Sequence, residues 1–418
     1  MNGRTEAIAG SGSSSLEEWC YRTLALSVWA IAFSIALGEV LLALTFVLFV
    51  AALVKEHRPP AFSVSSLLAV LFVIVAVVTA LRGTAPERSA DALTGLIWLA
   101  SIFVTATMVN THRRLTILLK AFSVGCGVLA LEICVLRPIN AFLAVRAGES
   151  AGRGLLDEII NRGSMTDGQM LVAGIIAVLG VIYTARTERK RYGGWIVLLA
   201  ILAAGMIVNF KRGSWICACV AAAGFMAAKG NWKYLFVGAL IAAAAALLPP
   251  VRYRLSSISS DSRGRIVMWT KAAPGLMREH PWGVGYGALN NEMMRRHAPN
   301  VEPDRNHLHS NIFQILVETG WPGLGVWSLW MAVVLIESLR FCRKGDSIEE
   351  SIHPTLDPVL TVLTPEERFS AGSNNALVLL FVLLGLLMNG LIEYNFGDTE
   401  IMVVYSFVMG CVIAGNRR

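Results

Sequence analysis

The sequence predicts an all-α protein that crosses a membrane about twelve times. Of its 418 residues, 55% are hydrophobic and only 16% are charged, whereas soluble proteins contain about 45–50% and about 25% respectively. Apolar runs of roughly 20 residues, the length that a helix needs to cross the hydrocarbon layer, recur along the chain. This composition excludes a soluble globular enzyme, a disulfide scaffold and a disordered regulator.

The predicted spans form a group of nine and a group of three, separated by a long polar loop. They lie near residues 22–37, 38–54, 62–82, 92–110, 114–135, 168–185, 193–210, 213–229, 233–249, 311–337, 375–393 and 399–415. Only Gly38 and Glu39 separate the first two spans. Residues 1–21 begin with a polar stretch rich in Gly and Ser that lacks the basic start of a signal peptide, so we expect a disordered cytoplasmic tail.

The basic residues of the short loops predict the orientation of the chain. Lys and Arg favour the cytoplasmic side of a membrane, and here they collect in alternate loops. This set comprises Lys55 and Arg58, Arg113 and Arg114, Arg186 to Arg191, Lys229 and Lys233, Arg340 to Lys344, and Arg417 and Arg418. We therefore expect both termini and the loop 338–374 in the cytoplasm.

Two segments place cations on the opposite, outer side. Lys211 and Arg212 lie in a short outer turn, where the bias of short loops disfavours them. The outer loop 250–310, which we expect to be largely helical, carries nine Lys and Arg against five Asp and Glu, and four of the seven histidines. Cationic and titratable side chains are thus gathered on one face.

This pattern favours a site for a phosphorylated, lipid-anchored substrate. The planar fork of Arg donates two parallel hydrogen bonds to phosphate and keeps its charge. Lys211 and Arg212 precede a helix start, and His307 and His309 precede another at Asn311, and the N-terminus of a helix attracts anions. The same cations would also suit contact with lipid headgroups, and the two histidines would also suit ordinary loop positions. No Cys, Asp or Glu stands beside them at metal-ligand spacing, so no metal is expected.

Three further features of the outer region have mainly structural interpretations. Glu318 lies two to three helical turns after His309 and is expected to face the bundle interior and bond another helix. Residues 266–279, which include Trp269, suit an amphipathic helix at the membrane interface, kinked at Pro274. The glycines of residues 283–287 are not a nucleotide-binding motif, because no strand–turn–helix unit surrounds them.

Four motifs in this half of the chain resemble those of the O-antigen ligase and O-antigen polymerase superfamily. Residues 307–320, HLHSNIFQILVETG, are similar to its His-x-His-Asn … Glu-x-Gly signature. Arg265 and Trp269, followed by residues 281–287, are similar to its Arg-x-x-x-Trp … Pro-x-x-Gly-x-Gly stretch. The resemblance covers residues 205–415.

The other two motifs carry the same resemblance, and there are two departures. Residues 211–215 resemble a Ser-Arg-Gly-x-Trp element, with Lys211 where Ser is usual. Residues 393–398 resemble the acidic turn before the last span. Ser310 stands where Asn is common, which weakens a specific role for that amide and leaves His309 matched.

The resemblance implies a glycosyltransferase of the C type at the periplasmic face of a bacterial inner membrane. A ligase would move O-antigen from undecaprenyl pyrophosphate to a sugar hydroxyl of lipid A–core, without a metal or cofactor and with inversion. Pyrophosphate is a good leaving group, so the main task is to stabilise its developing charge. We assign that task to Arg212 and Arg265 with Lys211, and secondary contacts to Arg263 and Arg305.

The acceptor hydroxyl needs a general base, and imidazole titrates near neutral pH. We expect His309 to be this base, with His307 positioning the acceptor or acting as the base instead. Glu318, Asn311 and Trp269 are expected to support the site. The absence of paired carboxylates beside the cations argues against a retaining mechanism.

Other functions share part of this evidence. An O-antigen polymerase, which joins lipid-linked repeat units, would use the same residues; the strongly cationic loop favours a ligase, because lipid A–core is heavily phosphorylated. A transporter or flippase would suit twelve spans, but repeated halves and a midplane site are not apparent. A protein that only binds the lipid carrier is the third alternative. Membrane lipids are expected partners, and nucleic acid is not.

Overall fold

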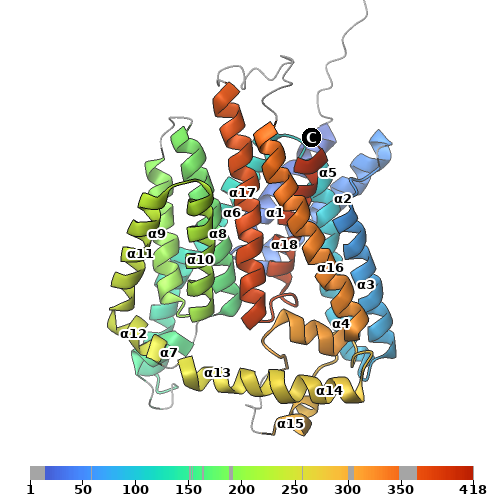
Figure 1. Cartoon of the computed structure of the whole chain (residues 1–418), viewed down its shortest axis with the longest axis vertical. Helices are drawn as coiled ribbons and strands as arrows, with labels where there is room; N and C mark the ends of the chain where they lie inside the picture. The colour runs from blue at the N-terminus through green and yellow to red at the C-terminus, as the bar shows by residue number, and fades with distance from the viewer. Residues whose placement is uncertain are drawn as a thin grey trace, which may run out of the picture.

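The computed structural model describes residues 15–417 except for residues 58, 150–151, 153, 162–163, 188–191, 257, 300–305 and 348–364. The described residues form helices and no strands, as Figure 1 shows. The helices are α1 (Ser15–Ala30), α2 (Ile35–Glu56), α3 (Val64–Arg82), α4 (Pro86–Gly95), the 3₁₀ helix η1 (Leu96–Ala100), α5 (Ser101–Met108), α6 (His112–Arg146), α7 (Leu155–Asn161), α8 (Met165–Thr187), α9 (Gly193–Val208), α10 (Arg212–Ala228), α11 (Trp232–Ala246), α12 (Pro249–Ser256), α13 (Ile258–Val267), the π-helical turn η2 (Met268–Ala272), α14 (Ala273–Glu279), α15 (Asn291–His297), α16 (Asn311–Ser347), α17 (Pro365–Ile392) and α18 (Thr399–Arg417).

The protein is a multi-pass membrane protein, and the prediction of an all-helical architecture is confirmed. Within the described residues, eight helical segments are long and apolar enough to cross a membrane: α2, α3, α4 through α5, α6, α8, α16, α17 and α18. The apolar helices α9 and α10 are shorter. The number of twelve spans therefore stays a prediction, although a helix lies at each of the twelve predicted positions.

The core of the bundle is built around α17 and α18. α17 packs between α8 and α10 on one side and α16 on the other, while α18 packs against α5, η1 and α16 (Figure 1). Every residue of α18 from Ile401 to Gly415 is buried. A helix that is apolar on all its faces must be enclosed by other helices or lipid, and here the other helices enclose it.

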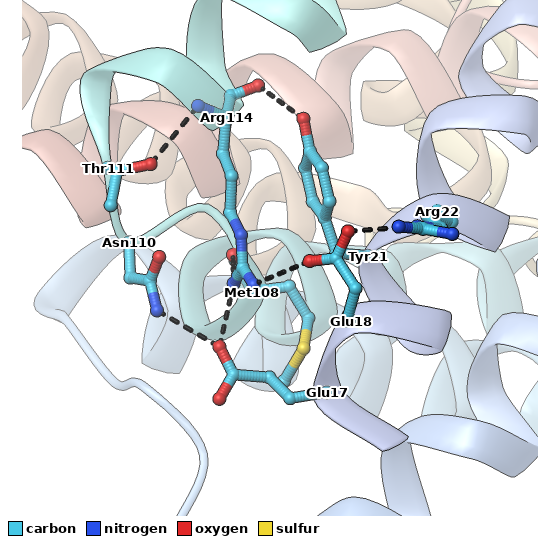
Figure 2. Close-up of polar contacts among 8 residues, drawn as sticks. All are labelled: Glu17, Glu18, Tyr21, Arg22, Met108, Asn110, Thr111 and Arg114. Carbon is cyan, nitrogen blue, oxygen red and sulfur yellow. Dashed lines mark hydrogen bonds and ion pairs between the residues drawn. The ribbon is translucent and has the colours of Figure 1, made fainter. Parts of the chain in front are cut away.

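The two ends of the bundle differ in their contents. At one end, called the terminal end here, α1 begins and α18 finishes. Figure 2 shows its main polar contact: Arg114 at the start of α6 donates to Glu17 (2.7 Å) and Glu18 (3.2 Å) of α1 and to the carbonyl of Met108 (2.9 Å), and the hydroxyl of Tyr21 donates to the carbonyl of Arg114 (2.8 Å). α1 is thereby tied to α6 by largely buried charges.

At the opposite end, called the site end here, α17 finishes and α18 begins. The short helices α12 to α15 lie across this end in Figure 1. α13, η2 and α14 follow one another without a break, where a kink at Pro274 was expected. The π-helical turn precedes Pro274, and this local widening accommodates a residue that lacks the N–H and crowds the preceding turn.

Several predicted boundaries are wrong. α1 begins at Ser15, so residues 15–21 are helical rather than part of a tail. The break between the first two helices lies at residues 31–34, before Gly38, because the Ser34 side chain caps α2 and the missing side chain of Gly38 lets Ile31 approach it closely. α16 and α17 extend into the segment 338–374, so the described part of that loop is helical.

Candidate functional site

Three helix ends meet at the site end, with the last turn of α17 between the first turns of α10 and α16. The Asn389 side chain of α17 donates to Ser214 Oγ of α10 over 3.2 Å. A Cβ atom at Gly213 would lie 2.7 Å from the side chain of Ile392, and Gly390 faces the side chain of Asn311 in the same close manner. Glycines permit this approach because they have no side chain to separate the backbones.

Glu393, the first residue after α17, is bound from two sides. Arg265 of α13 forms an ion pair with its Oε1 and also donates to the carbonyl of Ile392 over 2.7 Å. His309 Nδ1 lies 3.0 Å from the other oxygen, Oε2. The contacts join segments that are 128 and 84 residues apart in sequence, so one carboxylate connects the predicted phosphate ligand to the predicted base.

The electrostatics of this contact favour the ionised carboxylate. Burial raises the pKa of Glu393, but the hydrogen bond from His309 and the positive charges of Arg265, His309 and His307 outweigh it, so the net pKa lies below the usual value. An ionised Glu393 only accepts hydrogen bonds. His309 Nδ1 therefore carries the proton of this contact, and its other ring nitrogen, Nε2, takes no part in it.

The two histidines lie against each other at the start of α16. Their ring centroids are 4.1 Å apart with the planes at 68°, and His309 is 2% exposed with a φ of 51°. The Trp269 indole donates to the carbonyl of Leu308 between them (2.7 Å) and stacks on Phe313, with ring centroids 5.5 Å apart. Trp269 thus supports the backbone that presents both imidazoles.

The turn that carries Glu393 is anchored on its other side. The Asn395 side chain donates to Gln169 over 2.7 Å, and Asn311 bonds both the side chain and the backbone N–H of Asn395 at 2.7 and 2.9 Å. Phe396 is fully buried and packs edge-on against Phe72, Trp327 and Trp330 with centroids 5.6 to 6.1 Å apart. These contacts hold the turn rigidly, and Asn311 contributes through the turn.

A second polar group lies beside the first turn of α10. Lys211 precedes α10 and Arg212 opens it, both partly exposed. Arg137 of α6 donates to Asn209 and pairs with Asp167 of α8, and Lys211 is close enough for its charge to act on Asp167. Asn209, at the start of the turn that carries Lys211 and Arg212, is therefore held by Arg137 of α6, which Asp167 of α8 holds in turn.

The remaining predicted residues take different positions. Arg263 is exposed on α13, and two residues of helix rotate it to the face opposite Arg265; Arg305 lies outside the described residues. Glu318 is 3% exposed and accepts from Gln314 of its own helix at 2.7 Å, whereas a bond to another helix was expected. The i, i+4 spacing brings these two side chains together on one helix face.

The glycine-rich segment 283–287 docks on a break in α16. The N–H groups of Val284 and Gly285 donate to the carbonyls of Val317 and Glu318 at 2.9 and 3.0 Å. α16 is interrupted at Gly320, whose φ of 68° and ψ of −172° are not helical. A backbone in this conformation leaves carbonyls of the preceding turn free of helical hydrogen bonds, and the glycine-rich segment 283–287 donates to them. This segment therefore has a structural role.

A cavity of about 230 Å³ adjoins the site between the α1–α2 turn, α6, α8 and the start of α18. Its polar lining consists of Ser34, Glu132, Arg137, Asn140, Thr166, Asp167 and Glu400. It does not include Arg265, His309 or Glu393. Thr166 links it to their turn by donating to Asp398 over 2.8 Å, and burial raises the pKa of Asp398 to about 6.

Sequence reasoning overlooked Glu393 as a site residue. It was noted only as part of an acidic turn, although its carboxylate lies beside the predicted phosphate ligand Arg265. A carboxylate directly after an apolar span, followed by Asn395 and Asp398, was the available signal. Its two partners come from distant segments, so the pairing itself was not visible. In the described part of the chain, no group of three or more His, Cys, Asp or Glu is arranged to hold a metal.

Comparison with known proteins adds one family match. Residues 196–328 match the family model described as O-antigen ligase. The chain contains an O-antigen ligase family domain. This family indicates, in general terms, an enzyme that transfers lipid-linked glycans. A search of curated proteins gives no match.

The O-antigen ligase domain contains most of the site. It spans most of α9, all of α10 to α15 and the first half of α16, and so includes Arg212, Arg265 and His309. It ends before Glu393. The carboxylate that joins Arg265 to His309 therefore comes from the part of the chain beyond the matched domain.

Proposed function

We propose that the protein is an O-antigen ligase. It transfers O-antigen from undecaprenyl pyrophosphate to a sugar hydroxyl of lipid A–core at the periplasmic face of the bacterial inner membrane, with both termini in the cytoplasm. The observation that carries the proposal is the contact series Arg265–Glu393–His309 at the site end, beside the first turn of α10. It combines a phosphate-binding cation with an oriented imidazole.

Arg212 and Arg265, with Lys211, stabilise the leaving pyrophosphate. As the bond between the anomeric carbon and the phosphate oxygen breaks, its electron pair passes to undecaprenyl pyrophosphate. Guanidinium groups held beside that oxygen lower the barrier because the charge develops there. The ion pair with Glu393 and the bond to the Ile392 carbonyl hold Arg265 in place before substrate arrives.

His309 acts as the general base through Nε2. Glu393 accepts a hydrogen bond from the Nδ1–H group, which fixes the tautomer, as a carboxylate does for an imidazole in other enzymes. The acceptor hydroxyl gives its proton to Nε2 while its oxygen forms the new bond to the anomeric carbon. This single displacement inverts the anomeric centre. Both oxygens of Glu393 are already bound, which disfavours its use as a nucleophile.

The alternatives differ in their products. An O-antigen polymerase would use the same residues on a second lipid-linked repeat unit. A flippase would move the substrate without covalent transfer, and a carrier-binding protein would bind it without reaction. The cationic loop 250–310 supports the ligase, since its acceptor is itself phosphorylated.

The deciding experiment gives purified protein both lipid-linked O-antigen and lipid A–core. Joined product, resolved by gel electrophoresis, is the expected result. Longer lipid-linked chains with no joined product would establish a polymerase instead. In proteoliposomes, translocation without any covalent product would identify a transporter.

A further inference from the structure

A second cavity, of about 590 Å³, lies at the terminal end, far along the bundle from the site. It is formed between the final turns of α16 and α18 and is lined by Glu337, Arg340, Arg343, Lys344 and Asn416. The Asn416 side chain donates to the carbonyl of Glu337 over 2.7 Å, and Lys344 Nζ donates to the carbonyl of Asn416 over 2.5 Å. These two bonds join the final turns of α16 and α18 beside the cavity.

The cavity is cationic, because its one acidic lining residue is engaged elsewhere. Glu337 is 9% exposed, and its carboxylate accepts from Ser65 Oγ at 2.5 Å and faces the Ser65 N–H at 3.5 Å. Ser65 lies in the first turn of α3, where the helix dipole also favours a negative charge. Arg340, Arg343 and Lys344 line the cavity and are exposed, so three cations are accessible there.

An apolar stripe on α16 leads to these cations. Leu329, Ile336 and Leu339 are 55%, 48% and 48% exposed. Spacings of three to four residues place Ile336 and Leu339 on the same helix face as Arg340 and Arg343, one turn nearer the membrane centre. This stripe belongs to a membrane-crossing helix, so its apolar side chains face acyl chains.

We propose that this cavity binds the headgroup phosphate of an anionic phospholipid, whose acyl chains lie along the stripe of Leu329, Ile336 and Leu339. Arginines bind phosphate through two hydrogen bonds each, and basic pockets between membrane helices bind anionic headgroups. A free phosphate would use the cations alone, whereas a lipid uses the cations and the stripe together. The proposal is independent of the transferase function.

The test is native mass spectrometry of the full-length protein in detergent, titrated with phosphatidylglycerol and, separately, phosphatidylcholine. Wild-type protein is expected to bind phosphatidylglycerol at least about tenfold more tightly. The variant R340Q/R343Q/K344Q is expected to lose roughly 100-fold in that affinity, and R343Q alone about fivefold. If the triple variant does not fold, R343Q alone provides the test.

The matched control is K55Q/R113Q/K233Q, which removes three exposed cations from other helix ends at the terminal end. It is expected to change the affinity by less than about threefold. Equal losses in the two triple variants, or equal binding of both lipids, would overturn the proposal. So would competition by inorganic phosphate at the same concentration as the lipid, because the acyl chains would then contribute nothing.

Discussion

In the proposed mechanism, Glu393 determines how Arg265 and His309 are presented to the substrate. Because it binds Arg265 and His309 with different oxygens, a shift of this one side chain would displace both. Arg265 also donates to the carbonyl of Ile392, the last residue of α17. The position of the carboxylate thus couples leaving-group stabilisation to base orientation.

Glu393→Gln is expected to lower kcat by on the order of 100-fold or more, because the amide keeps the size of the side chain but no longer fixes the tautomer of His309. Steady-state transfer assays with purified protein measure this. Glu292→Gln, which removes an exposed carboxylate on α15, is the control and is expected to retain normal turnover. Equal activity of the two variants would contradict the role of Glu393.

His309→Ala and Arg212→Ala are both expected to reduce transfer strongly, but by different routes. Loss of the base lowers kcat by roughly 100- to 10,000-fold. Loss of the guanidinium mainly weakens binding of the lipid-linked donor, by about 10- to 100-fold in Kd. Direct donor-binding measurements separate the two effects. A His309→Ala protein with near-normal turnover would refute the assignment of the base.

At the scale of helices, the break in α16 sets the position of the whole glycine-rich segment. Gly320→Ala is expected to destabilise the protein by about 2 kcal/mol or more, because φ is 68° there and a Cβ atom would lie 2.6 Å from the backbone of Trp282. Gly325→Ala in the same helix has open space and an ordinary φ, so it is expected to stabilise by up to about 1 kcal/mol. Thermal unfolding in detergent measures both, and a similar effect of the two changes would be evidence against the break.

The attachment of α1 to α6 depends on the buried charge of Arg114 (Figure 2). Arg114→Gln leaves Glu17 buried without its cation and is expected to destabilise the protein by about 3–5 kcal/mol. Arg22→Gln removes only an exposed partner of Glu18 and is expected to change stability by less than about 1 kcal/mol. The two variants are compared by thermal unfolding; equal losses would show that burial of the pair does not matter.

At the scale of the whole molecule, the two ends of the bundle are expected to face different compartments. In a chain without native cysteines, Arg295→Cys on α15 is expected to react with a membrane-impermeant maleimide in cells whose outer membrane alone is opened. Arg417→Cys at the end of α18 is expected to react only after the inner membrane is also opened, since the basic terminal end favours the cytoplasm. The reverse labelling pattern would invert the orientation and place the site in the cytoplasm.

The sequence by itself determined the features that depend on neighbouring residues. Apolar runs gave helices at all twelve predicted positions, and the helix starts near Arg212 and Asn311 followed from local composition. The break between α1 and α2 was misplaced because a glycine that permits close approach lies beside the turn rather than in it. The α16 and α17 extensions were missed because helices continue beyond the hydrocarbon, where the hydropathy signal ends.

Only the tertiary structure decided which residues meet. His309 and Glu393 are 84 residues apart, and Arg265 and Glu393 are 128 apart, so no periodicity links them. The same holds for Ser65 and Glu337, 272 residues apart, whose contact leaves the second cavity cationic. Such pairs form because burial makes an unpaired charge costly, and the packing of whole helices, rather than local sequence, determines which partner is within reach.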